Sequence, residues 1–330
     1  MASRCAPRPN RVTACPARCK KPPNTDPSAP APATRIALID ARLVDHRPRF
    51  KPRPLARCAV HTAYIFCFPI DCAVPIIPAV LAVVLAAGRG TRMGALTATI
   101  PKPLLHLCGR PIIEHILLGL RSAGVHETIV ITGYRGEQIE AYLGDGTRLG
   151  MRLSYRRQER AEGTGRALLL VRDVLGAQPF LLSWGDVVVD AAEYGALRAD
   201  FARLPCDTLL SVNAIDDPWR GAAVYVDSDG RVTGLVEKPP RGSSTTRWNN
   251  AGVFAFTPLI LDYAGRLTPS LRGEYELPQA IAAMLADGHV IRAHALGGFW
   301  SDLGTPEDLT AAERAFRPLD APPGSAALHD

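Results

Sequence analysis

An apolar run that ends in a glycine-rich loop constrains this chain more than any other feature of its sequence. The run, Ala79–Ala87, contains β-branched and small apolar residues without polar alternation, which is typical of a strand buried on both faces of a parallel sheet. Residues 88–93 then read GRGTRM, and residues 101–103 read PKP. Because loops at the carboxyl ends of parallel strands lie at the ligand-binding edge of a sheet, we expect a binding site here.

This loop is suited to bind a polyphosphate. Gly88 and Gly90 let the backbone approach phosphate oxygens closely and turn its N–H groups toward them. Arg92 can contact the oxygens through its planar guanidinium, and Lys102 can act as a point charge. The competing interpretation is an ordinary glycine turn with a surface arginine and lysine, because short glycine patterns often occur without a ligand.

Two other glycine motifs fit less well. A dinucleotide-binding loop has glycines at relative positions one, three and six directly before a helix, whereas here they lie at 88, 90 and 94. Pro101 and Pro103 also interrupt any helix that would follow at once. The phosphate-binding loop of nucleoside triphosphatases requires Gly-Lys-Ser or Gly-Lys-Thr, which this loop lacks.

The order of the expected elements indicates a layered α/β domain. Beyond the first strand, we expect strands at 128–132, 153–157 and 180–184, and helices at 111–120, 137–143 and 165–175. After residue 204 the pattern shifts to antiparallel pairing, with a hairpin of strands 222–226 and 231–236 around an Asp-Ser-Asp-Gly turn. The remaining expected elements are a strand at 251–256 and helices at 277–285 and 305–316.

The first 78 residues differ from the rest in composition. They carry a net charge of +9, which leaves −3 for the remaining chain, and they hold 14 of the 29 prolines and six of the eight cysteines. Proline at this density disfavours helix and sheet, so we expect a disordered extension. A nucleic-acid or membrane arm, a metal site and a cleaved targeting peptide are alternatives. We favour upstream sequence outside the functional protein, as a start codon assigned too early would give.

The body of the chain has no pattern typical of a membrane protein or a disulfide-rich protein. It contains only Cys108 and Cys206, too few for a disulfide framework, which fits a reducing cytoplasm. No segment reaches the roughly 18 uninterrupted apolar residues of a transmembrane helix. We therefore expect a cytoplasmic protein that has neither a membrane nor nucleic acid as its partner.

Two aspartates are candidate ligands of a divalent cation. Asp186 follows Gly185 at the carboxyl end of a buried strand, where a parallel sheet binds ligands. Mg²⁺ takes carboxylate and phosphate oxygens, so one or two aspartates beside a polyphosphate suffice. Asp302 lies between a strand-like segment and the start of a helix, where a turn or a helix cap is the competing role.

Three further polar segments offer groups to a ligand. Residues 158–165 read QERAEGTG, and Gln158 with the following Gly163-Thr164 pair presents amide and backbone groups suited to a base edge. The alternative is a helix capped by Thr164. Glu237-Lys238 ends one strand and Asn250 begins another, and both segments either bind a hydroxyl-rich ligand or are simply polar strand ends.

Taken in order, these segments resemble the sugar-1-phosphate nucleotidyltransferase family, the nucleoside-diphosphate-sugar pyrophosphorylases. The resemblance covers about residues 80–316 and rests on the motifs LAAGxGTRM, PKP, QxxxxGTG, GDV, EKP, NAG and WxDxGT. We therefore expect a nucleotidyltransferase domain at 79–316 and a flexible tail at 317–330. The predicted fold class is α/β: a Rossmann-like three-layer α/β/α domain with a mixed, mainly parallel central sheet and a smaller antiparallel sugar-binding portion.

The resemblance also implies roles for the matching residues. The nucleotide would be bound by Ala87, Gly88, Gly90, Thr91, Gln158, Gly163 and Thr164. Catalysis would depend on Arg92, Lys102 and Asp186. Mg²⁺ would be held by Asp186 and Asp302. The sugar phosphate would be bordered by Glu237, Lys238, Asn250 and Gly252.

The implied activity is the Mg²⁺-dependent transfer of a nucleotidyl group from a nucleoside triphosphate to a sugar 1-phosphate. Gln158 and its loop favour UTP or dTTP, but Trp184 and Arg166 depart from the family pattern, so both the nucleotide and the sugar stay open. A homo-oligomer also stays open. The alternatives are a cytidylyltransferase acting on phosphocholine or a similar alcohol phosphate, a glycosyltransferase, and a non-catalytic nucleotide-sugar sensor.

Overall fold

The computed structural model describes residues 81–319. The expected disordered extension at 1–78 lies outside these residues, as do Ala79, Val80 and the expected tail from residue 320 onward. Within 81–319, no helix combines the length and the apolar character needed to cross a membrane.

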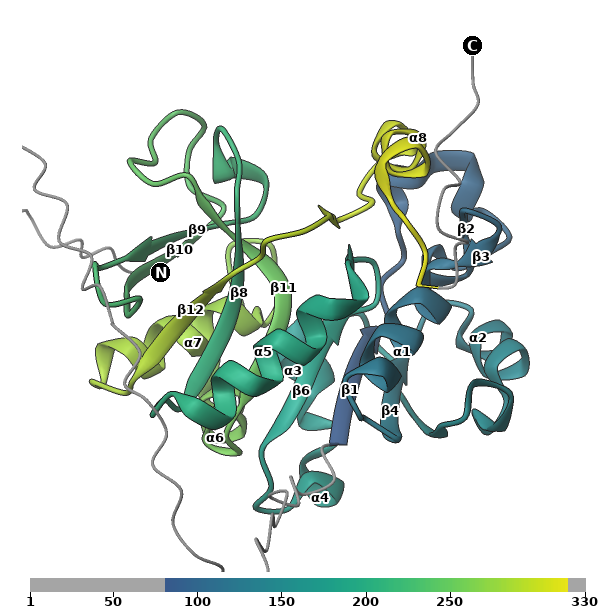
Figure 1. Cartoon of the computed structure of the whole chain (residues 1–330), viewed down its shortest axis with the longest axis horizontal. Helices are drawn as coiled ribbons and strands as arrows, with labels where there is room; N and C mark the ends of the chain where they lie inside the picture. The colour runs from purple at the N-terminus through teal and green to yellow at the C-terminus, as the bar shows by residue number, and fades with distance from the viewer. Residues whose placement is uncertain (1–80, 320–330) are drawn as a thin grey trace, which may run out of the picture. The chain divides into compact units, whose positions relative to one another are not determined.

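Nine strands form the central sheet (Figure 1): β1 (Leu81–Ala86), β4 (Glu127–Thr132), β5 (Arg152–Arg157), β6 (Phe180–Trp184), β8 (Thr208–Ala214), β9 (Ala222–Val226), β10 (Val232–Glu237), β11 (Trp248–Phe256) and β12 (Ile291–Ala295). The order is β10-β9-β11-β6-β1-β4-β5, and β8 pairs with both β11 and β12. Neighbours among β6, β1, β4 and β5 are parallel, whereas β11 runs antiparallel to β6 and β8. This mixed sheet confirms the predicted fold class.

Eight α-helices accompany the sheet in residues 81–319: α1 (Ile112–Ser122), α2 (Gly136–Leu143), α3 (Thr164–Leu169), α4 (Arg172–Leu175), α5 (Ala191–Arg203), α6 (Leu259–Arg266), α7 (Leu277–Ala286) and α8 (Pro306–Ala315). The 3-10 segments are η1 (Thr91–Thr97), which is kinked at Gly94, η2 (Lys102–Leu104), η3 (Thr147–Leu149) and η4 (Pro218–Arg220). Two small ladders lie apart from the main sheet: β2 (His106–Leu107) with β3 (Arg110–Pro111), and β7 (Val188–Val189) with β13 (Trp300–Ser301).

The helices cover the two faces of the sheet in separate apolar clusters. Ala82 and Val84 of β1 belong to the cluster that includes the buried side chains of α1 and α5. Val83 and Leu85 belong to the other cluster, with those of α3, α6 and α7. β1 is therefore buried on both faces, which explains why its sequence shows no polar alternation.

Several expected elements form at the expected residues. β6 occupies 180–184, and β9 and β10 form the antiparallel hairpin. The turn of that hairpin is stabilised by Asp227, whose carboxylate accepts hydrogen bonds from the backbone N–H groups of Asp229 and Arg231, both at 2.9 Å. The first helix begins one residue after Pro111, as a proline at a helix start favours.

The structure also differs from the sequence-based expectation. The single helix expected at 165–175 is divided into α3 and α4, because Val171 leaves helical geometry (φ −113°, ψ 5°) while its side chain is fully buried in the apolar core. α5, β8, α6 and β12 were not predicted. β8 escapes recognition because the polar residues Ser211 and Asn213 interrupt an otherwise apolar run, although both are buried.

Candidate active site

A cleft of about 680 Å³ lies beside the carboxyl ends of β1 and β6. Arg92, Lys102 and Asp186 all line it, so the three residues expected to carry catalysis share one cavity. The cleft is also lined by these residues expected from the sequence: Ala87, Gly88, Gly90, Thr91, Gln158, Gly163, Thr164, Glu237, Lys238, Asn250 and Asp302. Gly252 alone among the expected site residues is not part of this lining.

The glycine loop after β1 is held in place by contacts with η1 and Lys102. Gly90 has a φ of 63°, and a Cβ at this position would lie 2.9 Å from Cβ of Lys102. Both the backbone conformation and the lack of space therefore disfavour a side chain here. The carbonyl of Gly90 accepts hydrogen bonds from the Met93 N–H (2.9 Å) and from the Thr97 hydroxyl (3.0 Å). Met93 is 1% exposed. The buried end of η1 thus holds the loop in place while its glycines and Arg92 face the cleft.

Lys102 is a buried cation between the two aspartates. It is 4% exposed, and its Nζ donates to Oδ2 of Asp186 at 2.7 Å and to the backbone carbonyl of Asp302 at 3.2 Å. Because a buried charge needs a partner of opposite sign, this arrangement fixes the ammonium group inside the cleft. Lys102 therefore connects the loop after β1 to the two segments that carry Asp186 and Asp302.

The short β7–β13 ladder brings the two aspartates together. Val188 pairs with Ser301 and Val189 with Trp300, so Asp186 precedes one strand of the ladder and Asp302 follows the other. Burial and, secondarily, the charge of Asp186 raise the pKa of Asp302, while Lys102 opposes that rise. The two carboxylates are thus close enough to repel each other, which is the situation that a bound cation relieves.

The expected cap role of Asp302 is only partly present. Its Oδ1 accepts a weak hydrogen bond from the Gly304 N–H at 3.3 Å, a turn contact. The cap of α8 is Thr305, which forms a capping box with Asp308. Arg92 lies against Gly304, where a Cβ would stand 3.2 Å from its Nη1.

The aspartate pair fits Mg²⁺ by its donor chemistry. Within residues 81–319 there is no group of three or more histidine, cysteine, aspartate or glutamate side chains arranged to hold a metal. Zinc sites usually need three or four such ligands, whereas Mg²⁺ takes one or two carboxylates and fills its remaining positions with phosphate oxygens and water. Asp186 and Asp302 are therefore suited to Mg²⁺ beside a polyphosphate.

Gln158 is oriented by the loop that it precedes. Its Nε2 donates to the carbonyl of Gly163 at 3.0 Å, which leaves Oε1 as an acceptor. Gly163 has a φ of 98° and packs against the backbone of Tyr275. Thr164 does not cap α3, because it is the first helical residue and its hydroxyl accepts from the Leu277 N–H at 2.9 Å. The hydroxyl of Thr164 thus joins this loop to α7.

Arg166 lies outside the main cleft. Its guanidinium stacks 4.2 Å from the ring centre of Tyr275, and it lines a separate cavity of about 350 Å³. Trp184, the other departure from the family pattern, does line the main cleft.

Gly252 packs behind Trp184 and is not part of the cleft lining. Gly252 has a φ of 80°, and a Cβ there would overlap the indole of Trp184. The missing side chain of Gly252 thus leaves room for Trp184, which borders the cleft. Asn250 is 2% exposed, and its Oδ1 accepts from the Gly252 N–H at 3.1 Å. Within the described residues its Nδ2 has no hydrogen-bond partner.

A charged cluster near Glu237 was not predicted. The segment before α7 brings Arg272 and Glu276 into the cleft, where Arg272 forms an ion pair with Glu276 and lies 3.9 Å from Glu237. Nζ of Lys238 lies 3.5 Å from the Glu237 carboxylate. The only sequence signal was the charged run RGEYE at 272–276, which does not reveal that it folds against β10.

The pKa values of the two carboxyl groups in this cluster are shifted in opposite directions. Burial and the neighbouring carboxyl of Glu276 raise the pKa of Glu237 to about 7. Burial alone would also raise the pKa of Glu276, but hydrogen bonds from Arg272 and Glu237 lower it instead. Just below pH 7 the pair therefore holds a proton mainly on Glu237, while Glu276 stays ionised beside Arg272.

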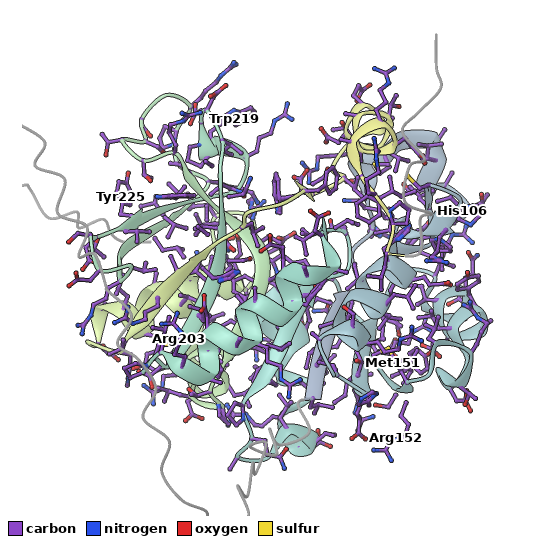
Figure 2. All side chains as sticks on the ribbon, viewed as in Figure 1. His106, Met151, Arg152, Arg203, Trp219 and Tyr225 are labelled. Carbon is purple, nitrogen blue, oxygen red and sulfur yellow. The ribbon has the colours of Figure 1, made fainter. Side chains whose placement is uncertain are left out.

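Arg220 of η4 adds another cation to the cleft lining. Its guanidinium lies 5.1 Å from the ring centre of Trp219, and Arg241 lies 5.6 Å from the same ring. Trp219 itself is at the outer end of the loop between β8 and β9 (Figure 2). No local motif distinguished Arg220 from an ordinary surface arginine.

Comparisons with known proteins add evidence independent of this geometry. Residues 81–317 match the family model described as Nucleotidyl transferase. The chain is 34% identical over 240 residues to the UTP–glucose-1-phosphate uridylyltransferase AglF of Haloferax volcanii, which covers 72% of this chain and 96% of that protein. It is 31% identical over 233 residues to a glucose-1-phosphate thymidylyltransferase of Streptomyces griseus.

The extent of these matches differs among the relatives. The chain spans 65% of the length of the Streptomyces griseus protein and 54% of that of the bifunctional protein GlmU of Methanococcus maripaludis. In three dimensions it is similar to a UDP-glucose pyrophosphorylase complexed with UDP-glucose, with a TM-score of 0.66. That alignment covers 71% of this chain and 97% of the other at 21% identity, and it supports the fold.

Proposed function

The chain belongs to the nucleotidyl transferase family, among the sugar-1-phosphate nucleotidyltransferases, and on this premise we propose that it transfers a nucleotidyl group from a nucleoside triphosphate to a sugar 1-phosphate. One observation carries the proposal. A single cleft contains the glycine loop, Lys102 bonded to the segments of both aspartates, and the Glu237–Lys238 end of β10. Such a cleft has room for a triphosphate beside a phosphorylated sugar.

The reaction requires two anions to meet. A phosphate oxygen of the sugar 1-phosphate bonds to the α-phosphorus of the triphosphate, the bond from that phosphorus to the bridging oxygen breaks, and pyrophosphate leaves. Arg92 and Lys102 offset the repulsion between the two phosphates and stabilise the charge that develops on the oxygens. No covalent intermediate on the protein is needed, because positioning and charge neutralisation carry most of the work in such transfers.

Mg²⁺ dependence is part of this proposal. Asp186 and Asp302 would hold the ion, and Mg²⁺, when bound, supplies further neutralisation of the phosphate oxygens. Lys102 keeps both aspartate segments at the cleft through its two hydrogen bonds.

The orientation of Gln158 supports UTP or dTTP as the nucleotide. With Nε2 committed to the Gly163 carbonyl, Oε1 is free to accept a hydrogen bond. Uracil and thymine present an N–H donor at N3, whereas cytosine presents an acceptor there. The free Oε1 of Gln158 therefore suits the N3–H donor of these two bases.

The other end of the cleft suits a sugar phosphate. Lys238 and Arg272 provide positive charge for the phosphate, and Glu237 provides a carboxyl group for hydroxyl groups, with Asn250 beside it in the cleft lining. Polar side chains of this kind, placed in a concave site, typically fix the orientation of a small polar ligand.

The experiment that tests the proposal is pyrophosphate release with a panel of triphosphates and phosphate acceptors. We expect release with UTP or dTTP and a sugar 1-phosphate, and only when both are present. Release with CTP and phosphocholine would instead establish the cytidylyltransferase. Tight nucleotide binding without release from any pair would establish the sensor.

A further inference from the structure

The segment that carries Asp302 into the cleft is held by residues that lie outside the cleft. Residues 296–301, here called the strap, run from the end of β12 across to the loop before α8 (Figure 1). The strap contains Gly297 and Gly298 and ends in β13, directly before Asp302. Only two residue pairs join β13 to β7, so this ladder by itself is a short support.

Two carboxylates of α5 bind the strap through its backbone. Oε1 of Glu193 accepts hydrogen bonds from the N–H groups of Gly297 at 3.0 Å and Gly298 at 2.9 Å. Oδ2 of Asp190 accepts from the Phe299 N–H at 2.9 Å, and the Asp190 N–H donates back to the Phe299 carbonyl at 3.2 Å. Three consecutive N–H groups of the strap are thus bound by two acidic side chains.

Both carboxylates lie where acidic side chains usually stabilise the N-terminus of a helix, but they bind the strap instead. Asp190 is the N-cap residue of α5, and Glu193 lies in the first turn, yet Asp190 makes no side-chain cap hydrogen bond. An aspartate at the N-cap typically stabilises a helix by accepting a hydrogen bond from a backbone N–H of its first turn. α5 forgoes this stabilisation, and neither side chain lines the cleft. Their contribution is made through the strap.

The fit between α5 and the strap leaves little room for movement. A Cβ at Gly298 would overlap the Asp190 carboxylate, so this glycine is required by the close approach. The Glu193 side chain is 12% exposed, and its other oxygen lies 3.4 Å from Nε2 of His294 at the β12 end. Beyond the glycines, Nε1 of Trp300 donates to the Ala251 carbonyl at 2.9 Å.

From these contacts we propose that Asp190 and Glu193 are positioning residues for Asp302. By fixing the strap they hold the Asp302 carboxylate beside Asp186 and so set the affinity of the cleft for a divalent cation. This inference rests on the proposed function, because it takes Asp302 to be a metal ligand. Residues that orient metal ligands without touching the metal commonly change metal affinity by about 10- to 100-fold when they are lost.

The test is Mn²⁺ binding to the full chain in the presence of UTP, measured by the electron paramagnetic resonance signal of free Mn²⁺. Glu193→Ala should weaken Mn²⁺ binding about 10- to 100-fold and raise the Mg²⁺ concentration for half-maximal pyrophosphate release by a similar factor. Glu193→Gln should bind Mn²⁺ nearly as wild type does, because its amide oxygen still accepts from both glycine N–H groups.

Two further variants separate positioning from general stability. Asp200→Ala removes a carboxylate of the same helix that accepts from His294 at 2.9 Å and does not contact the strap. It should lower the melting temperature and leave Mn²⁺ affinity unchanged. Gly298→Ala should weaken Mn²⁺ binding as Glu193→Ala does, which provides the test if Glu193→Ala does not fold.

The outcomes that overturn the inference are distinct. Unchanged Mn²⁺ affinity in folded Glu193→Ala or Gly298→Ala would show that the contacts are structural only. An equal loss in Asp200→Ala would show that packing of α5, and not the strap, is responsible. If the wild-type chain neither binds Mn²⁺ with UTP nor releases pyrophosphate with any pair, the proposed function fails, and the inference fails with it.

Discussion

Lys102 and Lys238 are the only lysines in residues 81–319, and their surroundings predict different kinetic roles. Lys102 is buried between the segments of Asp186 and Asp302, where charge develops during the proposed transfer. Lys238 is partly exposed beside Glu237, at the end of the cleft suited to the sugar phosphate. Lys102 therefore stabilises the transition state, whereas Lys238 contributes to binding of the substrate in the ground state.

Replacing each lysine tests this distinction. Lys102→Ala should lower kcat by about 100-fold or more, as loss of a preorganised electrostatic donor does. Lys238→Ala should mainly raise KM for the sugar 1-phosphate. Steady-state kinetics with both substrates varied would measure the two effects. A Lys102→Ala enzyme with unchanged kcat would place the chemistry elsewhere.

The proton on Glu237 predicts a pH-dependent stability. Its pKa of about 7 lies above the ordinary 4.5, so the folded state binds a proton that the unfolded state has lost between these values. This contribution is fully present below pH 4.5 and is lost as the pH rises through about 7. Glu237→Gln has no proton to lose at this position, so its stability lacks this dependence on pH.

The measurement is urea unfolding of wild type and Glu237→Gln across this pH range. The free energy of unfolding of the wild type should fall relative to that of the variant as the pH rises toward 8. A difference that stays constant with pH would show that Glu237 is not protonated in the folded state.

Which site residues could be predicted depended on how local their signal is. Gly90, Lys102 and Asp186 follow strands whose buried character is visible in the sequence, so the rule for parallel sheet edges locates them. Arg272 and Glu276 reach the cleft only because α7 packs against β10, a contact between segments that are far apart in sequence. Gly252 belongs to a familiar motif, yet only the structure shows that its missing side chain serves Trp184.

At the scale of elements, the close approach of β11 to the end of β6 depends on Gly252. Its positive φ and the neighbouring Trp184 indole both disfavour a side chain. Gly252→Ala should therefore destabilise the protein by about 1 to 3 kcal/mol or more, as overpacking of a core does. Chemical denaturation would measure this loss.

A matched control separates the two causes. Gly144 also has a positive φ, of 59°, but a Cβ there would meet nothing within 4 Å. Gly144→Ala therefore reports backbone strain alone, and the additional loss in Gly252→Ala reports the clash. Equal losses in the two variants would show that Trp184 moves aside without cost.

Two of the elements that the sequence did not reveal, α5 and β12, have weak apolar patterns. α5 buries only Tyr194 and Leu197, so its apolar stripe is too narrow to predict a helix. β12 has a short mixed pattern, and its pairing with β8 supplies the support that its sequence lacks. The strongly buried strands β1, β4 and β6 were predicted because burial on both faces leaves a continuous apolar run.

For the whole molecule, the family match spans residues 81–317 and does not include the first 78 residues. Among the residues that the structure describes, the two core clusters are built from residues 82–316. A chain of residues 79–330 should therefore keep the turnover of the full chain, measured by pyrophosphate release. A large loss of turnover in a folded 79–330 chain would contradict the prediction that residues 1–78 lie outside the functional domain.

In the proposed function, Asp186, together with Lys102 and the glycine loop, forms the centre at which nucleotidyl transfer occurs. The most direct test is the rate of pyrophosphate release by Asp186→Ala with the best pair of substrates, alongside its affinity for the triphosphate. We expect release to fall by about 100-fold or more while the triphosphate still binds through residues 88–92. Release at the wild-type rate would contradict it.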